Sequence, residues 1–346
     1  MVTTERPDPK DEPPAMGQAH DKRLDGNHHM EMRGDRIEAK IFRHESIPGL
    51  FDYIAQRNNK TETNTRQMKR FFLIAAAVII QAFSLAAQPP QVPQSIRFAG
   101  QTITFDRPDL YERMDRELIT FTYMHTNSTL MLKRANRIFH EVEPILERNG
   151  IPDDLKYLMA IESNLDPASV SPAGAAGLWQ FMAATAKQYG LEVNSNVDER
   201  YNTEKATEAA CKYLKDAYAR YGDWMTVAAS YNAGMGSIST KLNDQREDSA
   251  LDLWLVTETS RYMFRILAAK MMFEDPLSFG FNVTEADKYP YREPRKVVTV
   301  SDTISNLVAF AGQHGTSYAR LKEANLWLRE DKLNDSSHKV YYIIIP

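Results

Sequence analysis

Glu162 is the residue whose type and position best suit acid–base chemistry. Residues 151–163 predict a helix with Pro152 at its first position and an apolar stripe along one face. Glu162 continues that stripe in the last turn, where an apolar setting and the negative end of the helix dipole both raise the pKa of a carboxyl group. A carboxyl group that stays protonated near neutral pH can act as a general acid. The alternative is that Glu162 turns outward into solvent from a frayed helix end.

A small-residue loop, residues 171–182, follows this helix. Its glycines and alanines allow close approach of the backbone and leave room for a ligand. Gln180 is the one amide in an apolar run of Trp179, Phe181 and Met182. If buried, Gln180 needs a hydrogen-bond partner, and a sugar amide or hydroxyl would serve. The alternative is a tight turn between helices with a satisfied core amide.

The elements around these residues predict a mainly α, all-helical catalytic domain over residues 106–286. Helices are expected over residues 134–149, with Gly150 as the cap, from 202 or 203 to 221, over 224–232 and over 261–273. Residues 88–105 are expected to be a linker that holds a short strand, and residues 287–296, with two prolines among charges, a second linker. The last segment, 297–346, predicts a small α+β unit in the order strand, helix, helix, strand, its first helix opening at 301–303 with Ile304, Leu307, Val308 and Ala311 on one face.

Composition excludes several classes of function. The net charge of −4 argues against a protein that binds nucleic acid by neutralising phosphates. The single cysteine, Cys211, cannot form an internal disulfide, and we expect it to be a small buried residue. The eight histidines show no ligand spacing, so we predict neither a metal site nor a cofactor.

The N-terminal region predicts export. Residues 1–67 are polar and lack apolar periodicity, which is typical of a disordered segment. Because a signal peptide normally begins a protein and one is predicted from Met68 onward, these residues are alternatively expected to be an untranslated extension of the gene, with translation starting at Met68. Residues 68–87 then have the pattern of a signal peptide: a basic start, an apolar middle and small residues at the end. This pattern predicts a periplasmic or cell-envelope protein. The alternative is a membrane anchor with a cytoplasmic tail. No cysteine stands directly after the apolar stretch, where a lipid would be attached.

Four stretches together resemble the lytic transglycosylases of the goose-lysozyme-like superfamily, in particular the membrane-bound lytic murein transglycosylase D group. They are residues 151–163, 171–182, 228–234 and 257–268, in the order and spacing of that family. The resemblance covers about residues 105–281. It implies a lysozyme-like helical fold and cleavage of the β-1,4 bond between N-acetylmuramic acid and N-acetylglucosamine in peptidoglycan, with formation of a 1,6-anhydromuramic acid end.

The resemblance also implies a role for each matching residue. Glu162 would be the catalytic acid and base, Ser171 would bind the acetamido group of the substrate, and Gln180 would reach the glycan. Met182 would shape the apolar wall, and Tyr231 would lie near Glu162 and the reacting sugar, unless it is a core tyrosine. Asn232 would brace the loop before Gly234, and Tyr262 would line the cleft. Glu258 would support it, or would form an ion pair with Arg261 or Arg265.

A second carboxylate is not evident in the sequence. Asp166, Asp198, Glu199 and Glu204 lie in polar turns or at helix starts, where we expect them to cap helices and to be solvated. A single-carboxylate, substrate-assisted mechanism therefore fits the resemblance. The alternatives are a goose-type hydrolase, which needs a second carboxylate about 6.5–9.5 Å away, and a catalytically silent glycan-binding protein.

Residues 297–346 resemble a LysM module, a small binder of N-acetylglucosamine polymers, although Ser301 stands where such modules usually have glycine. The resemblance implies that this tail tethers the enzyme to peptidoglycan and leaves the rate on short fragments unchanged. The alternative is a structural domain that has lost its glycan. Peptidoglycan strands are the partner that the sequence predicts.

Overall fold

The computed structural model describes residues 88–334 and 339–346. The extension expected over residues 1–67 and the signal peptide expected over 68–87 lie outside these residues. Within the described ranges, no helix is both long and apolar enough to cross a membrane.

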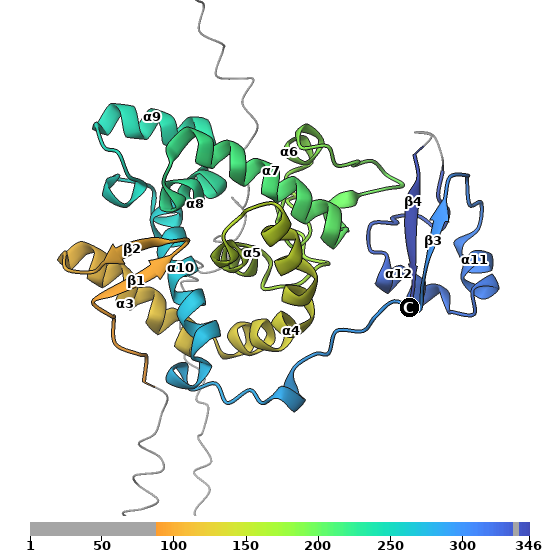
Figure 1. Ribbon diagram of the computed structural model, residues 1–346, viewed down its shortest axis with the longest axis horizontal. Helices are drawn as coiled ribbons and strands as arrows, with labels where there is room; N and C mark the ends of the chain where they lie inside the picture. Colours follow the sequence, from red (N-terminus) through yellow and green to blue (C-terminus); the bar gives the residue numbers. More distant parts are fainter. Residues whose placement is uncertain (1–87, 335–338) are drawn as a thin grey trace, which may run out of the picture. The chain divides into compact units, whose positions relative to one another are not determined.

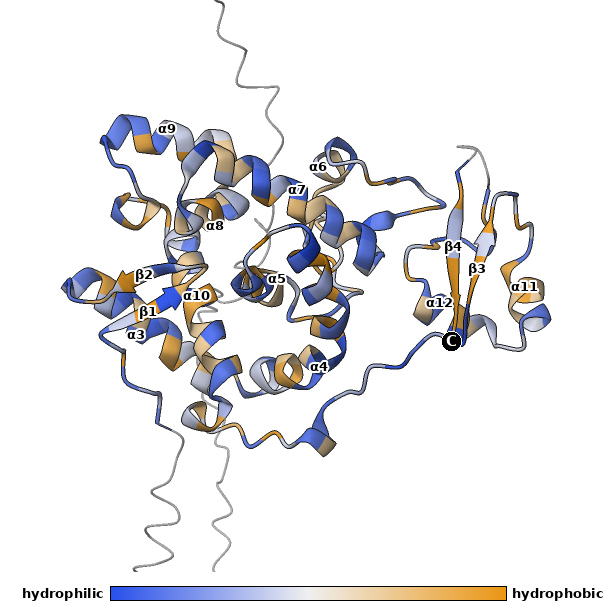
Figure 2. Cartoon of the chain, in the orientation of Figure 1, coloured by the Kyte–Doolittle hydropathy of each residue, from blue (hydrophilic) through white to orange (hydrophobic). Residues whose placement is uncertain are grey.

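The first described part is mainly helical, which confirms the predicted fold class (Figure 1). Helix α10 packs against α3, α5 and α8, so it links most of the domain core. Figure 2 shows that α9, of which only Ile238 is buried, is largely hydrophilic. The helices are α3 (Pro108–Tyr123), α4 (His125–Arg148), α5 (Lys156–Ser163), α6 (Ala183–Gln188), α7 (Thr203–Tyr221), α8 (Trp224–Ala233), α9 (Met235–Gln245) and α10 (Thr257–Glu274).

Side-chain and glycine caps set the helix ends where the sequence predicts them. The Asn202 side chain accepts from the backbone N–H of Lys205 at the start of α7, and Gly222 ends that helix with a φ of 65°. Asp223 then caps α8. These caps orient α7 and α8, which both contact the small-residue loop.

Two predictions about local structure are wrong. Residues 88–105 are not a linker, because they contain an antiparallel hairpin of β1 (Ser95–Phe98) and β2 (Gln101–Thr104). The inward side chains of this hairpin are buried in the core of the helical domain. Pro152 does not begin a helix either, since its ψ of 135° is extended; a 3₁₀ turn, η2 (Asp153–Leu155), comes between it and α5.

The C-terminal module, residues 296–346, has the predicted order of elements. Strands β3 (Lys296–Val300) and β4 (Tyr341–Ile345) pair antiparallel and flank α11 (Leu307–Gln313) and α12 (Tyr318–Ala324). Helix α11 begins later than predicted, because Asn306 is its N-cap and Ile304 instead pairs with Leu333 through backbone hydrogen bonds. Val308 is consequently exposed and not part of the buried face.

The hairpin yields a test of the domain boundary. Phe98 is fully buried, so Phe98→Ala is expected to lower the free energy of unfolding of the catalytic domain by about 3–5 kcal/mol. Arg97→Ala, on the exposed side of the same strand, is the control and should change it by less than about 0.5 kcal/mol. Denaturant unfolding measures both. An unchanged midpoint for Phe98→Ala would mean that the hairpin lies outside the cooperative unit.

Candidate active site

Glu162 lies in the interior of the helical domain and not at a frayed end. Every residue of α5 is buried, and Glu162 is only 2% exposed. The phenol of Tyr262, on α10, donates a hydrogen bond to Glu162 Oε1 at 2.5 Å. The structure therefore joins two residues that the sequence predicted as site residues.

Burial raises the pKa of Glu162 to about 7. The hydrogen bond from Tyr262 and the positive charge of Arg265 act in the opposite direction, whereas the negative charge of Glu258 adds to the increase. Glu258, Tyr262 and Arg265 are spaced by four and three residues, so they share one face of α10. The raised pKa predicted from the sequence is confirmed, with burial as its main cause.

The chain turns sharply directly after Glu162. Asn164 and Leu165 have φ values of 52° and 54°, in the left-handed region that residues other than glycine seldom adopt. Arg134 of α4 holds this turn: its guanidinium donates to Asn164 O at 3.0 Å and to Asp166 at 3.1 Å. The turn leads from α5 into the segment before the small-residue loop. The two strained backbone positions therefore lie next to the candidate acid in sequence.

Ser171 begins the small-residue loop. Its hydroxyl oxygen accepts from Ala175 N at 2.9 Å, and its own N–H donates to Ala175 O at 2.8 Å. The side-chain oxygen thus has a structural task, which leaves its O–H proton as the group for a ligand. That Ser171 binds an acetamido group stays a prediction.

Gln180 combines a strained backbone with an unpaired acceptor. Its φ is 48°, and the residue is fully buried. Its amide nitrogen donates to Ser169 O at 3.2 Å and to Gly177 O at 2.8 Å, which fixes the orientation of the amide, since both partners are carbonyl oxygens. Within the described ranges, Gln180 Oε1 has no hydrogen-bond partner. The amide NH₂ group of Gln180 is thus satisfied, as expected for a core amide, whereas its carbonyl oxygen is the buried, unpaired acceptor.

Tyr231 is a core tyrosine. It is fully buried, and its hydroxyl donates to Trp179 O at 2.8 Å, next to Gln180 in the chain. Burial is the main cause that raises its pKa, and the charge of Glu162 adds to it, which places the two side chains in one neighbourhood. The observed contact positions the small-residue loop, and the place of Tyr231 near the reacting sugar stays a prediction.

The remaining predicted residues lie around this centre. Met182 is the N-cap residue of α6, and Asn232 is buried in the last turn of α8. The Arg261 guanidinium bonds to the buried Glu117 of α3 at 2.8 Å, and the suggested ion pair of Glu258 with Arg261 or Arg265 stays a prediction.

The expectation that polar carboxylates cap helices and stay solvated holds only in part. Asp198 does cap η3 (Glu199–Tyr201), but Asp198 and Glu199 are both buried. Asp198 bonds to the guanidinium of Arg200, a residue that sequence reasoning missed, as it missed Arg134. The tertiary partners of Arg134 and Arg200 lie 19 to 32 positions away in sequence, so the pattern of charges along the chain does not identify these two arginines as site residues.

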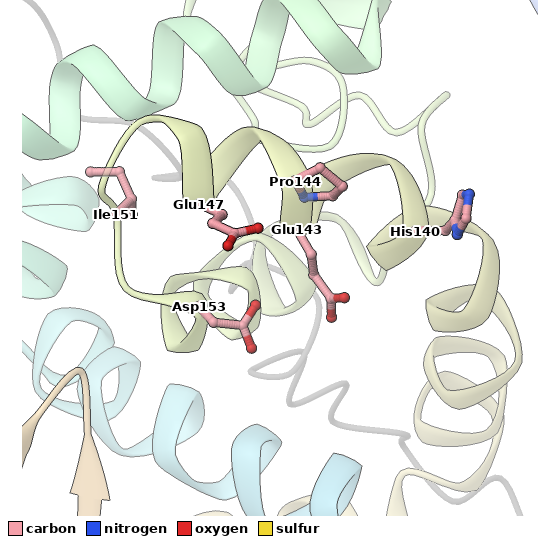
Figure 3. Close-up of a pocket in the computed structure, with 6 residues that line it drawn as sticks. All are labelled: His140, Glu143, Pro144, Glu147, Ile151 and Asp153. Carbon is pink, nitrogen blue, oxygen red and sulfur yellow. The ribbon is translucent and has the colours of Figure 1, made fainter.

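An open cavity of about 560 Å³ lies beside α4 and η2, lined by none of the predicted site residues. Figure 3 shows its labelled lining: His140, Glu143, Pro144, Glu147, Ile151 and Asp153. The ammonium of Lys156 bonds to Glu143 at 2.6 Å and to Asp153 at 2.5 Å, which compensates two of the carboxylates. In the parts of the chain that the structure describes, no group of three or more potential ligands is arranged to hold a metal ion.

Comparisons with known proteins match two regions. Residues 143–253 match the model of the transglycosylase SLT domain, and residues 296–346 match that of the soluble lytic transglycosylase C-terminal LysM-like domain. The chain is 27% identical over 259 residues to membrane-bound lytic murein transglycosylase D of Escherichia coli, covering 72% of this chain and 55% of that protein. It is 36% identical over 125 residues to peptidoglycan transglycosylase gp16 of Escherichia phage T7, covering 35% of this chain and 9% of that protein.

The 70 kDa soluble lytic transglycosylase of Escherichia coli is a structural neighbour with a TM-score of 0.35 and 18% identity. The alignment covers 52% of this chain and 33% of that one. The chain spans about half the length of the lytic murein transglycosylases D that it matches.

The raised pKa of Glu162 predicts a pH-dependent difference in stability. An acid whose pKa rises on folding from 4.5 to about 7 stabilises the folded state fully below pH 4.5, and this contribution is lost as the pH rises to about 7. Between pH 4.5 and 8, Glu162→Gln should therefore gain about 3 kcal/mol of unfolding free energy relative to the wild type. Denaturant unfolding at both pH values measures the gain.

The control is Glu204→Gln, whose side chain is 73% exposed. Its pH profile should run parallel to that of the wild type, because the carboxylate is solvated in both states. If the unfolding free energy of Glu162→Gln also changed with pH in parallel with that of the wild type, Glu162 would not be a buried acid with a raised pKa.

Proposed function

We propose that this chain, which carries a transglycosylase SLT domain followed by a LysM-like domain, is a peptidoglycan lytic transglycosylase. The observation that carries the proposal is Glu162, a buried carboxyl group inside the matched region that has a pKa of about 7 and accepts a hydrogen bond from Tyr262. Such a group is about half protonated at pH 7 and mostly neutral below it, so it can give up its proton to a leaving oxygen.

In the first step, Glu162 transfers its proton to the glycosidic oxygen between N-acetylmuramic acid and N-acetylglucosamine, and the C1–O bond breaks. The 2-acetamido group of the muramic acid stabilises the positive charge at C1, as in substrate-assisted glycosidases. The O–H of Ser171 is the donor proposed to orient this acetamido group, since the Ser171 oxygen is already fixed by Ala175.

In the second step, the Glu162 carboxylate accepts the proton of the C6 hydroxyl, and the C6 oxygen bonds to C1. The product is a 1,6-anhydro ring, the acid is regenerated, and no water is consumed. The unpaired Oε1 of Gln180 supports glycan binding, because a sugar hydroxyl or amide N–H would satisfy this buried acceptor.

A hydrolase of goose-lysozyme type is the second candidate, and Glu258 favours it. This half-buried carboxylate lies close enough to Glu162 to raise its pKa, so a second acidic group does stand near the first. Hydrolysis would add water to C1 and leave a reducing end. The two reactions therefore differ by one water in the mass of the product.

The proposed substrate lies in the cell envelope, so we also propose that the protein is exported there, by way of the signal-peptide pattern at residues 68–87. N-terminal sequencing of the native protein should find a mature end near Ala87 or Gln88. Peptides from residues 1–60 recovered from native cells would contradict the prediction that residues 1–67 are untranslated.

Mass spectrometry of muropeptides after digestion of isolated sacculi tests the reaction. The expected products carry 1,6-anhydromuramic acid ends, and Glu162→Gln should be slower by at least about 10²–10⁴-fold, because it retains the shape of the acid without its proton. Hydrated products that disappear in Glu258→Gln would establish the hydrolase instead. Near-normal turnover by a folded Glu162→Gln protein would rule out Glu162 as the acid.

The pH dependence tests the role of Tyr262. Because Glu162 must be protonated, kcat/KM should fall as the pH rises through about 7. The bond from Tyr262 lowers the pKa of Glu162, so Tyr262→Phe should move this fall to higher pH. Tyr157→Phe, a buried phenol on the same helix as Glu162, is the control and should leave it in place. A shift to lower pH in Tyr262→Phe would contradict the assignment.

A further inference from the structure

Arg200 is a buried arginine whose donors reach both its own segment and the small-residue loop. Its Nε and Nη2 donate to the two oxygens of Asp198 at 2.9 and 2.7 Å, so the pair is bidentate. Its Nη1 donates to Gly174 O at 2.7 Å and to Phe181 O at 3.0 Å. One guanidinium therefore ties together two carbonyl groups that lie seven positions apart in the loop that holds Ser171 and Gln180.

The backbone of Arg200 also lies against this loop. Gly177 has a φ of 77°, and a Cβ atom there would lie 1.9 Å from Arg200 O. No side chain fits at position 177, so the glycine is required by the close approach of two backbones. The position of the loop thus depends directly on where residues 198–200 lie.

The other side of the same segment is bound by the C-terminal module. Residues 192–201, named here the bridging segment, carry Val197, which is 1% exposed and belongs to the hydrophobic core of the module. Val197 forms an antiparallel bridge with Leu328, with Asp198 N donating to Trp327 O and Arg329 N donating to Asn196 O, both at 2.9 Å.

Side chains extend this contact on both sides of the backbone bridge. The Asn196 amide donates to Lys332 O at 2.8 Å and accepts from Asn334 N at 2.9 Å. Glu192 accepts from the hydroxyl of Tyr341 at 3.0 Å. The module therefore holds the bridging segment at Glu192 and at residues 196–198, directly before Arg200.

We propose that the C-terminal module positions the substrate-binding loop through the bridging segment, with Arg200 as the positioning residue. Without the module, Val197 would lose its apolar surroundings, and the backbone groups of residues 196 and 198 would lose their partners. The Asp198–Arg200 pair would then sit on a loosened strand. The proposal rests on the proposed binding of glycan by Ser171 and Gln180.

This arrangement differs from a tether that only raises local concentration. A tether would leave the binding of short soluble glycans unchanged, whereas a positioning module changes it, because the loop that contacts the glycan shifts. Position 200 also requires arginine. The ammonium group of a lysine cannot form the bidentate pair with Asp198 and donate two further hydrogen bonds to the loop.

Binding of the soluble tetrasaccharide of alternating N-acetylglucosamine and N-acetylmuramic acid tests the proposal. The full chain carries Glu162→Gln as a background, so that the ligand is not turned over. In this background Arg200→Lys and Val197→Asp should each weaken binding about 10-fold. The matched controls are Arg148→Lys, an exposed arginine that also pairs with carboxylates, and Val308→Asp, an exposed valine of the module; both should bind within about twofold of the parent.

Hydrogen exchange gives a second readout on the same proteins. The amides of Ala176, Gly177 and Gln180 are hydrogen-bonded within the loop and should exchange faster in Arg200→Lys and Val197→Asp, but not in the controls. If Val197→Asp does not fold, Val197→Ala replaces it in both measurements.

The outcomes separate the two claims. If the Glu162→Gln parent does not bind the tetrasaccharide, the proposed function fails, and loop exchange alone decides the positioning role. If the parent binds, and folded Arg200→Lys and Val197 variants bind equally well with unchanged exchange, the module does not position the loop and the proposal is overturned.

Discussion

The burial of one carboxyl group is the constraint on which the rest of the site depends. An ionised carboxylate without compensation is costly inside a protein, so Glu162 holds its proton to about pH 7. The Tyr262 phenol compensates part of this cost, and the packing of α5 against α10 brings the two side chains together. Because α10 also packs against α3 and α8, the acid is positioned by the core of the helical domain and not by a loop.

The small-residue loop is held differently, by hydrogen bonds with three other parts of the domain. Tyr231 of α8 donates to Trp179 O, the Trp179 indole donates to Thr207 of α7, and Arg200 donates to Gly174 O and Phe181 O. These contacts fix a segment in which Gln180 keeps a strained, positive φ. Such a conformation persists only where its surroundings determine it. In the account proposed here, the C-terminal module is part of those surroundings.

Local signals allowed the helices, their caps and the buried acid to be predicted from the sequence. The apolar stripe before Glu162, and Gly222 and Asp223 between α7 and α8, act over a few residues and can be read along the chain. The hairpin at residues 95–104 was predicted only as a short strand within a linker, because its two strands have four residues each and the single glycine of its turn, Gly100, also suits a linker. Arg200 was missed because its partners come from a loop far along the chain.

Difference infrared spectroscopy of the Glu162 carboxyl group tests the central claim most directly. The C=O stretch of the protonated acid, assigned by its absence from Glu162→Gln, is followed as the pH is raised. The account predicts that this band persists through pH 6 and disappears with a midpoint of about 7. Disappearance with a midpoint near the ordinary value of 4.5 would show that Glu162 is solvated and ionised at neutral pH, and would contradict its role as the acid.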